Sequence, residues 1–289
     1  MAKILCTGIA TLDIINEVQD YPDEDDEIRI LTQEKRRGGN ATNTAVVLSQ
    51  LGHQCSWAGT LVNEIDSQTI LSDLQHYRIN YDYCQFLEQG KIPTSYITLS
   101  QDSGSRTICH YRDLPEYSFE AFKKINLHQF DWFHFEGRNV SQTQQMMHWC
   151  KQQCPDTPIS VEIEKPRELI ADLFESADII LFSKQYALSQ AKTSAKAFCQ
   201  YISSQYPDKK IICAWGDSGA GAAFKQQYCW QAAQKIKAVD TLAAGDVFNA
   251  AIIAQLLQQS QLKKCLKYAC WLAAEKCTKK GIADLFQEK

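Results

Sequence analysis

The chain has 289 residues and an ordinary globular composition, with 45% hydrophobic and 22% charged residues. Its formal net charge of −4 argues against a surface built to bind nucleic acid or anionic membranes. No apolar run approaches the roughly 18 residues of a membrane span, and the first residues show no signal-peptide pattern. The sequence therefore predicts a soluble, cytoplasmic protein.

The 12 cysteines fall short of the density of a disulfide scaffold in a chain of this length. Most lie in apolar runs, where a reduced cysteine packs as a small hydrophobe. The most closely spaced pairs, Cys150 with Cys154 and Cys265 with Cys270, lack a second cluster of Cys or His. Reduced thiols are therefore expected, with a structural zinc site as the weaker alternative.

Residues 3–8 form a short apolar run that ends in glycine, a pattern typical of a buried central strand. Asp13 follows a few residues later. A carboxylate just past the C-terminal end of such a strand lies where open α/β sheets bind ligands. Local bonding within a turn is the alternative role for this side chain.

A small group of strands is predicted outside the main sheet. The acidic residues 23–26 indicate a solvated loop, which leads into a predicted strand at about 28–34. Two further strands within 93–111 flank Asp102-Ser103-Gly104, which is a hairpin signal. We expect these strands to close over a site or to pair with another subunit. Arg106, near the hairpin turn, is either a phosphate ligand or an exposed surface residue.

Gly38 and Gly39 precede a predicted helix that begins near Asn40 and ends near Leu51. Asn40 and Asn43 are three positions apart, so their amides project from the same face near the helix start. Each amide offers a donor and an acceptor, and two of them beside glycines suit a polyol ligand. A capping role is the alternative for one of the two.

The second half of the chain alternates predicted strands and helices. The strands span about 131–135, 159–164, 178–182 and 210–215, and polar or charged residues follow each of them. This register predicts a parallel sheet whose working edge lies at the C-terminal ends of its strands. A long helix is expected from Lys184 toward Tyr206. The glycines at 216–221 lack the context of a dinucleotide-binding fingerprint, and no P-loop signature is present.

Residues 240–246, Asp-Thr-Leu-Ala-Ala-Gly-Asp, lead small side chains into an apolar helix at about 247–254. A helix start carries unpaired N–H groups and a partial positive charge, and small side chains let a phosphate approach them. Asp246 would then hold a carboxylate that can accept a proton from an attacking hydroxyl. Its alternative role is that of a helix cap.

Residues 262–277 have the apolar spacing of an ordinary surface helix. The lysines of this region are interpreted as a solvated face: Lys263, Lys264, Lys267, Lys276, Lys279 and Lys280. No internal repeat, low-complexity stretch or domain linker is evident in the sequence.

With these pieces assembled, the chain resembles the ribokinase-like (phosphofructokinase-B) sugar kinases from its first strand to its last helix. Gly38-Gly39-Asn40-x-x-Asn43 is similar to the N-terminal signature of that family, and Asp240-Thr241-x-x-Ala244-Gly245-Asp246 is similar to its C-terminal signature. Either motif alone is a weak signal. The two in this order, about 200 residues apart, form a specific one.

The resemblance implies a ribokinase-like three-layer α/β/α fold with a mostly parallel central sheet, a small β-sheet lid and a single kinase domain over residues 1–289. It also implies ATP-dependent phosphorylation of a sugar hydroxyl. The phrases at 135–139, 161–168 and 213–215 are most similar to members that phosphorylate a ketose, which implies fructose and its 1-hydroxyl.

Site roles follow from the resemblance by position. Asp246 would be the catalytic base, and the backbone of Ala243, Ala244, Gly245 and Asp246 would form an anion hole over the transferred phosphate. The sugar would contact Asp13, Gly39, Asn40 and Asn43, with Asp25 reaching in from a partner subunit. The nucleotide would contact Arg106, Lys184, Gly216, Asp217, Ser218 and Gly219. The resemblance further implies Mg²⁺ on the phosphates, K⁺ as an activator and a homodimer clasped through the lid.

One departure concerns Ala243, where the family motif usually has glycine. The extra methyl group is tolerated if the backbone φ of this residue is negative, but a positive φ would strain it. We expect a working but slower anion hole.

Three alternatives stay open at this point. A kinase of the same family could act on ribose, another ketose, 2-keto-3-deoxygluconate or a nucleoside, because few polar residues define the sugar site. A sugar-binding regulator that has lost catalysis is the second, although the presence of Asp246 argues against it. An NAD-dependent oxidoreductase is the third, and the chain lacks its fingerprint.

Overall fold

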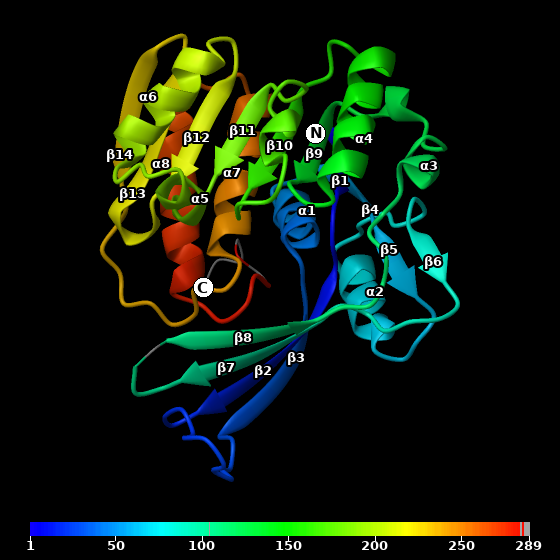
Figure 1. The fold of residues 1–289 in the computed structure, drawn as a ribbon, viewed down its shortest axis with the longest axis vertical. Coiled ribbons are helices and arrows are strands. Elements are labelled where there is room, and N and C mark those ends of the chain that lie inside the picture. Colours follow the sequence, from blue (N-terminus) through cyan, green and yellow to red (C-terminus); the bar gives the residue numbers. More distant parts are fainter. Residues whose placement is uncertain (104, 284, 286–289) are drawn as a thin grey trace.

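The computed structural model describes residues 1–103, 105–283 and 285, so the predicted hairpin residue Gly104 lies outside the described part (Figure 1). The main sheet contains β1 (Lys3–Thr7), β4 (Gln54–Ala58), β9 (Trp132–Glu136), β10 (Ile159–Ile163), β11 (Ile179–Phe182), β12 (Lys210–Ala214), β13 (Gly219–Phe224) and β14 (Gln227–Ala232). Across this eight-stranded sheet the order is β14-β13-β12-β11-β10-β9-β1-β4.

Most of this sheet is parallel. The strands from β4 across to β12 pair in parallel, and β13 and β14 add an antiparallel edge. Strands such as Ile179–Phe182 are buried along their whole length, which explains why their sequences are continuously apolar. The predicted parallel sheet is confirmed, and the C-terminal ends of its strands lie along one edge.

Helices cover both faces of the main sheet (Figure 1). The helices are α1 (Asn40–Gln50), α2 (Ser67–His76), α3 (Phe119–Phe122), α4 (Val140–Gln153), α5 (Lys184–Ser189), α6 (Ala195–Gln205), α7 (Ala244–Leu257) and α8 (Leu262–Cys277). Two cores result, because Ile4 and Cys6 of β1 point into the core with α1, α7 and α8, whereas Leu5 points into the core with α4 and α6. The three-layer α/β/α architecture is therefore confirmed.

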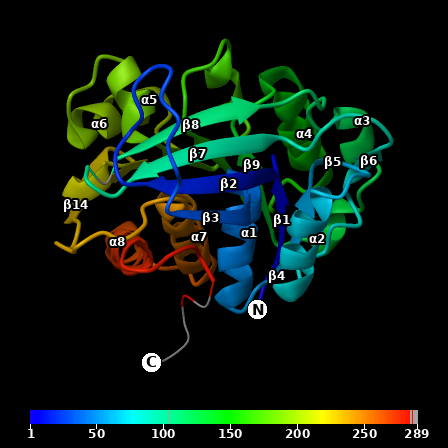
Figure 2. The same ribbon diagram turned by 90° about the horizontal axis from the view of Figure 1, so that it is seen from below.

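A second, smaller sheet stands apart from the main one (Figures 1 and 2). It contains β2 (Thr11–Val18), β3 (Thr32–Gly38), β7 (Thr94–Ser100) and β8 (Arg106–Tyr111), in the order β3-β2-β7-β8. A short pair, β5 (Thr60–Val62) with β6 (Gln85–Leu87), lies beside α2. We call the four-stranded unit the small sheet.

Two features of the small sheet differ from the sequence-based expectation. Asp13 lies inside β2 rather than in a turn after β1, since β2 follows β1 after only a short break. The strand expected at 28–34 begins at Thr32 and ends at Gly38. Its sequence is polar, and pairing with β2, in which Asp13 faces Arg36, fixes its register instead of an apolar pattern.

The long helix expected from Lys184 toward Tyr206 is broken into α5 and α6. Ser194 starts the second helix, because its side chain accepts a hydrogen bond from the Ala197 N–H. Within the described ranges, no helix is both long and apolar enough to cross a membrane.

The lysines of the C-terminal region do not all form a solvated face. Lys276 is fully buried, whereas Lys263, Lys264 and Lys267 are exposed. Lys276 follows Leu272 by four positions on α8, so both side chains point toward the core side of this helix.

Candidate active site

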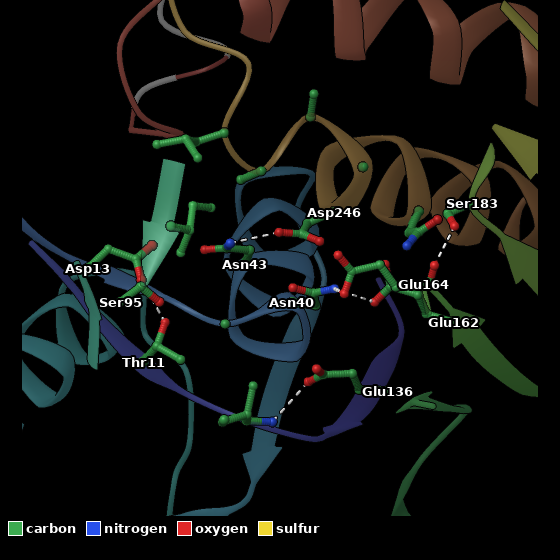
Figure 3. A pocket seen from close by; sticks show the side chains of 18 of the residues that line it. Thr11, Asp13, Asn40, Asn43, Ser95, Glu136, Glu162, Glu164, Ser183 and Asp246 are labelled. Carbon is green, nitrogen blue, oxygen red and sulfur yellow. Dashed lines mark hydrogen bonds between the residues drawn. The ribbon is translucent and has the colours of Figure 1, made fainter. Parts of the chain in front are cut away.

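A cavity of about 440 Å³ lies between the C-terminal ends of the parallel strands and the small sheet (Figure 3). Its wall includes many of the residues singled out in the sequence: Asp13, Gly39, Asn40, Asn43, Arg106, Ala243, Ala244, Gly245 and Asp246. The two sequence motifs therefore share one cavity. This position at the strand ends is where open parallel sheets bind ligands.

Asp246 lies in the first turn of α7 and is buried. Asn43, in the first turn of α1, donates a hydrogen bond from Nδ2 to Asp246 Oδ2 at 2.7 Å across a sequence separation of 203 residues. The other side of the Asn43 amide accepts a hydrogen bond from Arg37 at 2.7 Å. The Asn43 amide is thus oriented from both ends and joins the starts of the two helices.

Burial raises the pKa of Asp246 well above its usual value. The hydrogen bond from Asn43 acts in the opposite direction, while the negative charges of Glu164 and Glu136 raise the pKa further. A carboxylate with a raised pKa holds a proton more strongly once it has accepted one, which suits a general base.

An acidic wall faces Asp246 and was not assigned a role from the sequence. Glu136 ends β9, while Glu162 and Glu164 lie at the end of β10 (Figure 3). Asn40 Nδ2 donates to Glu162 Oε2 at 3.1 Å and to Glu164 Oε2 at 3.4 Å. Burial and the neighbouring carboxylates, Asp246 foremost, raise the pKa of Glu162.

The signal for this acidic wall was present in the sequence, since polar residues were expected after each parallel strand. Other residues of the cavity wall carried no such signal: Arg36, Ser95, His110 and Asn249. They come from strands of the small sheet and from inside α7. Only the folded chain brings them to the cavity.

Asp13 approaches the cavity from β2. Thr11 Oγ1 donates a hydrogen bond to Asp13 Oδ1 at 2.8 Å. Burial raises the pKa of Asp13, although the hydrogen bonds from Thr11 and Ser95 act to lower it. The carboxylate keeps a face toward the cavity, where it can accept a hydrogen bond from a ligand hydroxyl.

Two glycines allow β2 and the start of α1 to approach each other. A Cβ at Gly38 would collide with the Asp13 carboxylate, and a Cβ at Gly39 would collide with the Ile9 carbonyl oxygen. Gly39 also has a φ of 101°, which side chains strongly disfavour. The absence of side chains at Gly38 and Gly39 therefore allows Asp13 and the amides of α1 to line the same cavity.

The start of α7 presents main-chain N–H groups to the cavity. The space in front of Gly245 is open, since a Cβ built there would meet no atom within 4 Å. Arg106 of β8 donates a hydrogen bond to Thr241 Oγ1 at 2.6 Å, so a guanidinium lies beside this helix start. Helix N–H groups, open space and a guanidinium together suit an anion such as a phosphate.

Ala243 precedes α7 with φ 61° and ψ 9°, the left-handed conformation. Of the two possibilities that the sequence left open, the strained one is therefore realised at this residue. Its methyl group costs about 1–2 kcal/mol relative to the right-handed conformation.

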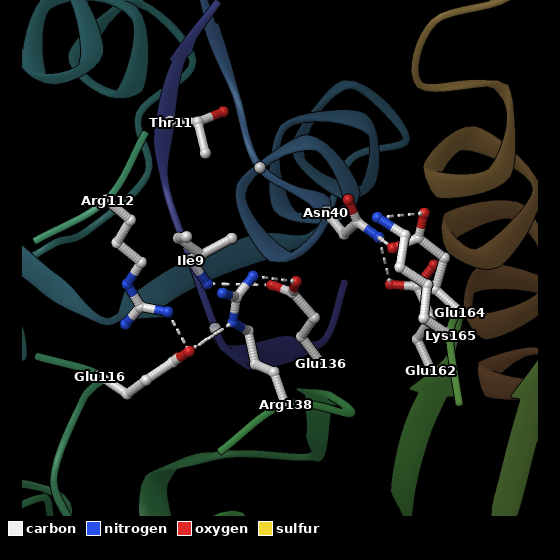
Figure 4. A network of polar contacts seen from close by, with 12 residues as sticks. Ile9, Thr11, Asn40, Arg112, Glu116, Glu136, Arg138, Glu162, Glu164 and Lys165 are labelled. Carbon is white, nitrogen blue, oxygen red and sulfur yellow. Dashed lines mark hydrogen bonds and ion pairs between the residues drawn. The ribbon is translucent and has the colours of Figure 1, made fainter. Parts of the chain in front are cut away.

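A charged network fixes the junction between β1 and β2 (Figure 4). Glu136 accepts a hydrogen bond from the Ile9 N–H at 3.0 Å and forms an ion pair with Arg138 at 3.0 Å. Arg138 also bonds Glu116, which in turn pairs with Arg112. The end of β9 is thereby tied to the short segment that leads from the main sheet into the small sheet.

Three groups of predicted site residues do not line this cavity. Asp25 lies in an exposed loop, and the Lys184 ammonium is 5.8 Å from the ring centroid of Trp215. Gly216–Ser218 forms a 3₁₀ turn that leads into Gly219 at the start of β13, next to Ala214 of the cavity wall.

Comparison with known proteins defines the class of this site. The family described as pfkB family carbohydrate kinase matches residues 1–289. The chain belongs to this family and is an ATP-dependent carbohydrate kinase, as the resemblance of its motifs predicted.

Individual relatives refine the comparison. The chain is similar to ketohexokinase of Mus musculus, at 36% identity over 97% of both chains. It is 21% identical to ribokinase of Bacillus subtilis, over 93% of this chain and 90% of the relative. The structure of Arabidopsis thaliana ribokinase complexed with ribose and ATP superposes with a TM-score of 0.81 at 19% identity, covering 98% and 95% of the two chains. The expected ribokinase-like fold is thereby confirmed.

The strain at Ala243 makes a testable prediction. Ala243→Gly removes the methyl group from a left-handed residue, so we expect the free energy of unfolding to rise by about 1 kcal/mol and Tm by roughly 2–4 °C. Thermal unfolding followed by circular dichroism measures the change.

The neighbouring Ala244→Gly is the matched control, because Ala244 is helical and glycine there should not stabilise the protein. A rise of the same size in both variants, or no rise in Ala243→Gly, would contradict the assignment of strain to Ala243.

Proposed function

We propose that the chain is a ketose kinase that transfers the γ-phosphate of ATP to the 1-hydroxyl of fructose. The observation that carries this proposal is the meeting of Asp246 with Asn43 and Asp13 in one cavity. The 36% identity with a ketohexokinase supports the choice of a ketose over other sugars. A general base, sugar-binding amides and an anion site are the groups that such a transfer needs.

The sugar would lie between the small sheet and the start of α1. Asp13 offers acceptors for two hydroxyls, and the amides of Asn40 and Asn43 offer donors and acceptors from one helix face. This arrangement would hold the attacking hydroxyl next to Asp246. The Asp246 carboxylate would accept the hydroxyl proton as the oxygen attacks the γ-phosphorus.

The N–H groups from Ala243 to Asp246 would stabilise the charge on the transferred phosphoryl group, together with Arg106. The rest of the nucleotide would extend along Ala214 toward Lys184 and Gly216–Gly219, which lie next to the cavity wall. The open space before Gly245 is consistent with this use, since it leaves room for phosphate oxygens.

Mg²⁺, when bound with ATP, would neutralise the phosphate charge. Within the described residues, no group of three or more His, Cys, Asp or Glu side chains is placed to hold a metal ion. Such an ion would therefore be bound mainly by phosphate oxygens and water, as is common for Mg²⁺. K⁺ is proposed as an activator on the family resemblance alone.

We also propose that the small sheet is a lid that pairs with a second copy of the chain. Its outer surface, away from the cavity, exposes Tyr96 and Tyr111, and β8 is exposed along its whole length. Such an apolar edge strand is a template for pairing with another chain. In a dimer of this kind, Asp25 of the partner subunit would reach the sugar.

The substrate is tested by measuring ADP release with ATP, Mg²⁺ and K⁺, using fructose and ribose in parallel. We expect turnover with fructose and a product phosphorylated at carbon 1, identified by NMR. Asp246→Asn should lower kcat by about 10²–10⁴-fold while the affinity for the sugar is kept, because the amide cannot accept the proton. Asp172→Asn, a change outside the cavity, is the control.

Turnover with ribose but not with fructose would show that the chain is a kinase of the same family with ribose as its substrate. Sugar binding without ADP release would favour a regulator that has lost catalysis.

The raised pKa of Asp246 predicts the pH dependence. Asp246 acts as a base only when ionised, so kcat/KM should rise with pH through its pKa and then level off. Glu164→Gln removes a neighbouring negative charge, lowers the Asp246 pKa and should shift the rising limb to lower pH. Initial rates over a pH series measure this shift, with the exposed Glu168→Gln as control. An unmoved limb in Glu164→Gln would contradict the electrostatic account.

The dimer is tested by Tyr96→Asp, which places a charge on the outer face of the small sheet, away from the cavity. Size-exclusion chromatography with light scattering should show a dimer for the wild-type protein and a monomer for this variant. Ile65→Asp is the matched control, because Ile65 is also exposed but lies outside the small sheet. A monomeric wild-type protein would refute the proposed pairing.

A further inference from the structure

Lys276 is a buried cation for which the proposed reaction has no use. Its side chain is fully buried near the end of α8, and it is not part of the cavity wall. Lysine is almost never fully buried unless it is paired. The partners of its ammonium group therefore indicate what it does.

The ammonium of Lys276 binds a single residue, Asp240, in two ways. Nζ donates a hydrogen bond to the main-chain carbonyl of Asp240 at 2.7 Å and lies 3.2 Å from Asp240 Oδ2. The N–H groups of Val239 and Asp240 donate in turn to the Cys277 carbonyl, at 2.8 Å and 3.2 Å. The end of α8 thus binds both the Asp240 carboxylate and the main chain of residues 239–240.

Asp240 gathers further contacts around its carboxylate. Oδ2 accepts hydrogen bonds from Arg36 at 3.1 Å and from the Gly281 N–H at 2.8 Å, and Oδ1 accepts one from the Leu242 N–H at 2.8 Å. Burial acts to raise the Asp240 pKa, but these hydrogen bonds and the Lys276 charge lower it overall. The carboxylate is therefore ionised and fully bonded.

The segment held in this way leads directly into the helix start that would bind the phosphate. Ala243, three residues after Asp240, has the strained left-handed conformation, and α7 begins at Ala244. Arg36 belongs to β3 and faces Asp13 in the pairing of β3 with β2. One carboxylate thus connects the helix start, the small sheet and the end of α8.

Stability alone does not account for a buried ion pair of this kind. Removing two charges from water is costly, and apolar side chains of similar volume often stabilise a protein as well or better. A cation does what an apolar side chain cannot: it fixes the direction of a carbonyl group and of a carboxylate at the same time. At Asp240 these groups set the path of the chain toward α7.

We propose that Lys276 is a positioning residue for phosphoryl transfer, whose ammonium holds the segment 240–243 so that the N–H groups of α7 meet the transferred phosphate. This proposal rests on the proposed function of the cavity. Lys276 is not part of the cavity wall, so it would act through the geometry of the helix start. Its effect should therefore appear in kcat rather than in the KM for the sugar.

Lys276→Met keeps most of the side-chain volume and removes the charge. We expect kcat to fall by about ten- to a hundredfold, as for a small misplacement of a catalytic group, with the sugar KM changed less than about twofold. Lys267→Met, an exposed lysine on the same helix, is the matched control and should behave like the wild-type protein. A folded Lys276→Met variant with unchanged kcat would overturn the proposal.

Chemical rescue separates positioning from a general loss of structure. Lys276→Ala should recover part of its kcat when methyl-, ethyl- or propylammonium is added at constant K⁺, whereas bulky tetramethylammonium at the same ionic strength should not act. If Lys276→Met does not fold, the double variant Lys276→Met/Asp240→Asn removes both charges together. A folded double variant with full kcat would overturn the proposal, and a reduced kcat would support it.

Hydrogen exchange read by mass spectrometry tests the same idea without turnover. The amides of residues 241–246 should exchange faster in Lys276→Met than in the wild-type protein, while those of β10 and β11 should be unchanged. Unchanged exchange at 241–246 would overturn the positioning role, even if the wild-type protein proved inactive on every sugar. Inactivity of the wild-type protein with the expected change in exchange would instead count against the proposed function alone.

Discussion

The buried hydrogen bond from Asn43 to Asp246 is the contact on which the arrangement of the site depends. It requires the first turns of α1 and α7 to lie side by side on one face of the main sheet, and the two helices pack against each other there. An amide beside a buried carboxylate has fixed donor and acceptor sides, so the orientation of one group determines the other. Both helix starts therefore open into the same cavity.

Charge is distributed unevenly around that cavity. The carboxylates of Glu136 and Glu162 face it from the strand ends and that of Asp246 from the start of α7. Burial and neighbouring negative charges raise the pKa values of Asp246 and Glu162. Guanidinium groups of Arg36 and Arg106 lie on the side of the small sheet and the segment before α7. In the proposed reaction, this distribution of charge would keep a base near the sugar and cations near the incoming phosphate, which separates the two tasks in space.

Buried carboxylates connect the small sheet to the main sheet. Glu136 bonds the main chain at Ile9, and Asp240 bonds Arg36 of β3. Each carboxylate is buried, so each must be fully bonded, and this need fixes the backbone that supplies the bonds. These polar contacts help to hold the small sheet over the cavity, together with the packing of Leu12 of β2 into the main core. Such contacts allow a defined geometry in a part of the protein that has little core of its own.

The sequence by itself determined the main sheet, the two helix starts and the family, because apolar runs and short motifs are local features. It also placed Asp13, Asn40, Asn43 and Asp246 on the list of site residues. Only the tertiary structure decided the bounds and register of β3, the meeting of the acidic wall with Asp246 and the burial of Lys276. β3 has no apolar pattern, and its register comes from pairing with β2. The burial of Lys276 depends on Asp240, which is 36 residues away. A local sequence pattern predicts that a charged side chain is exposed, because it does not show a distant partner.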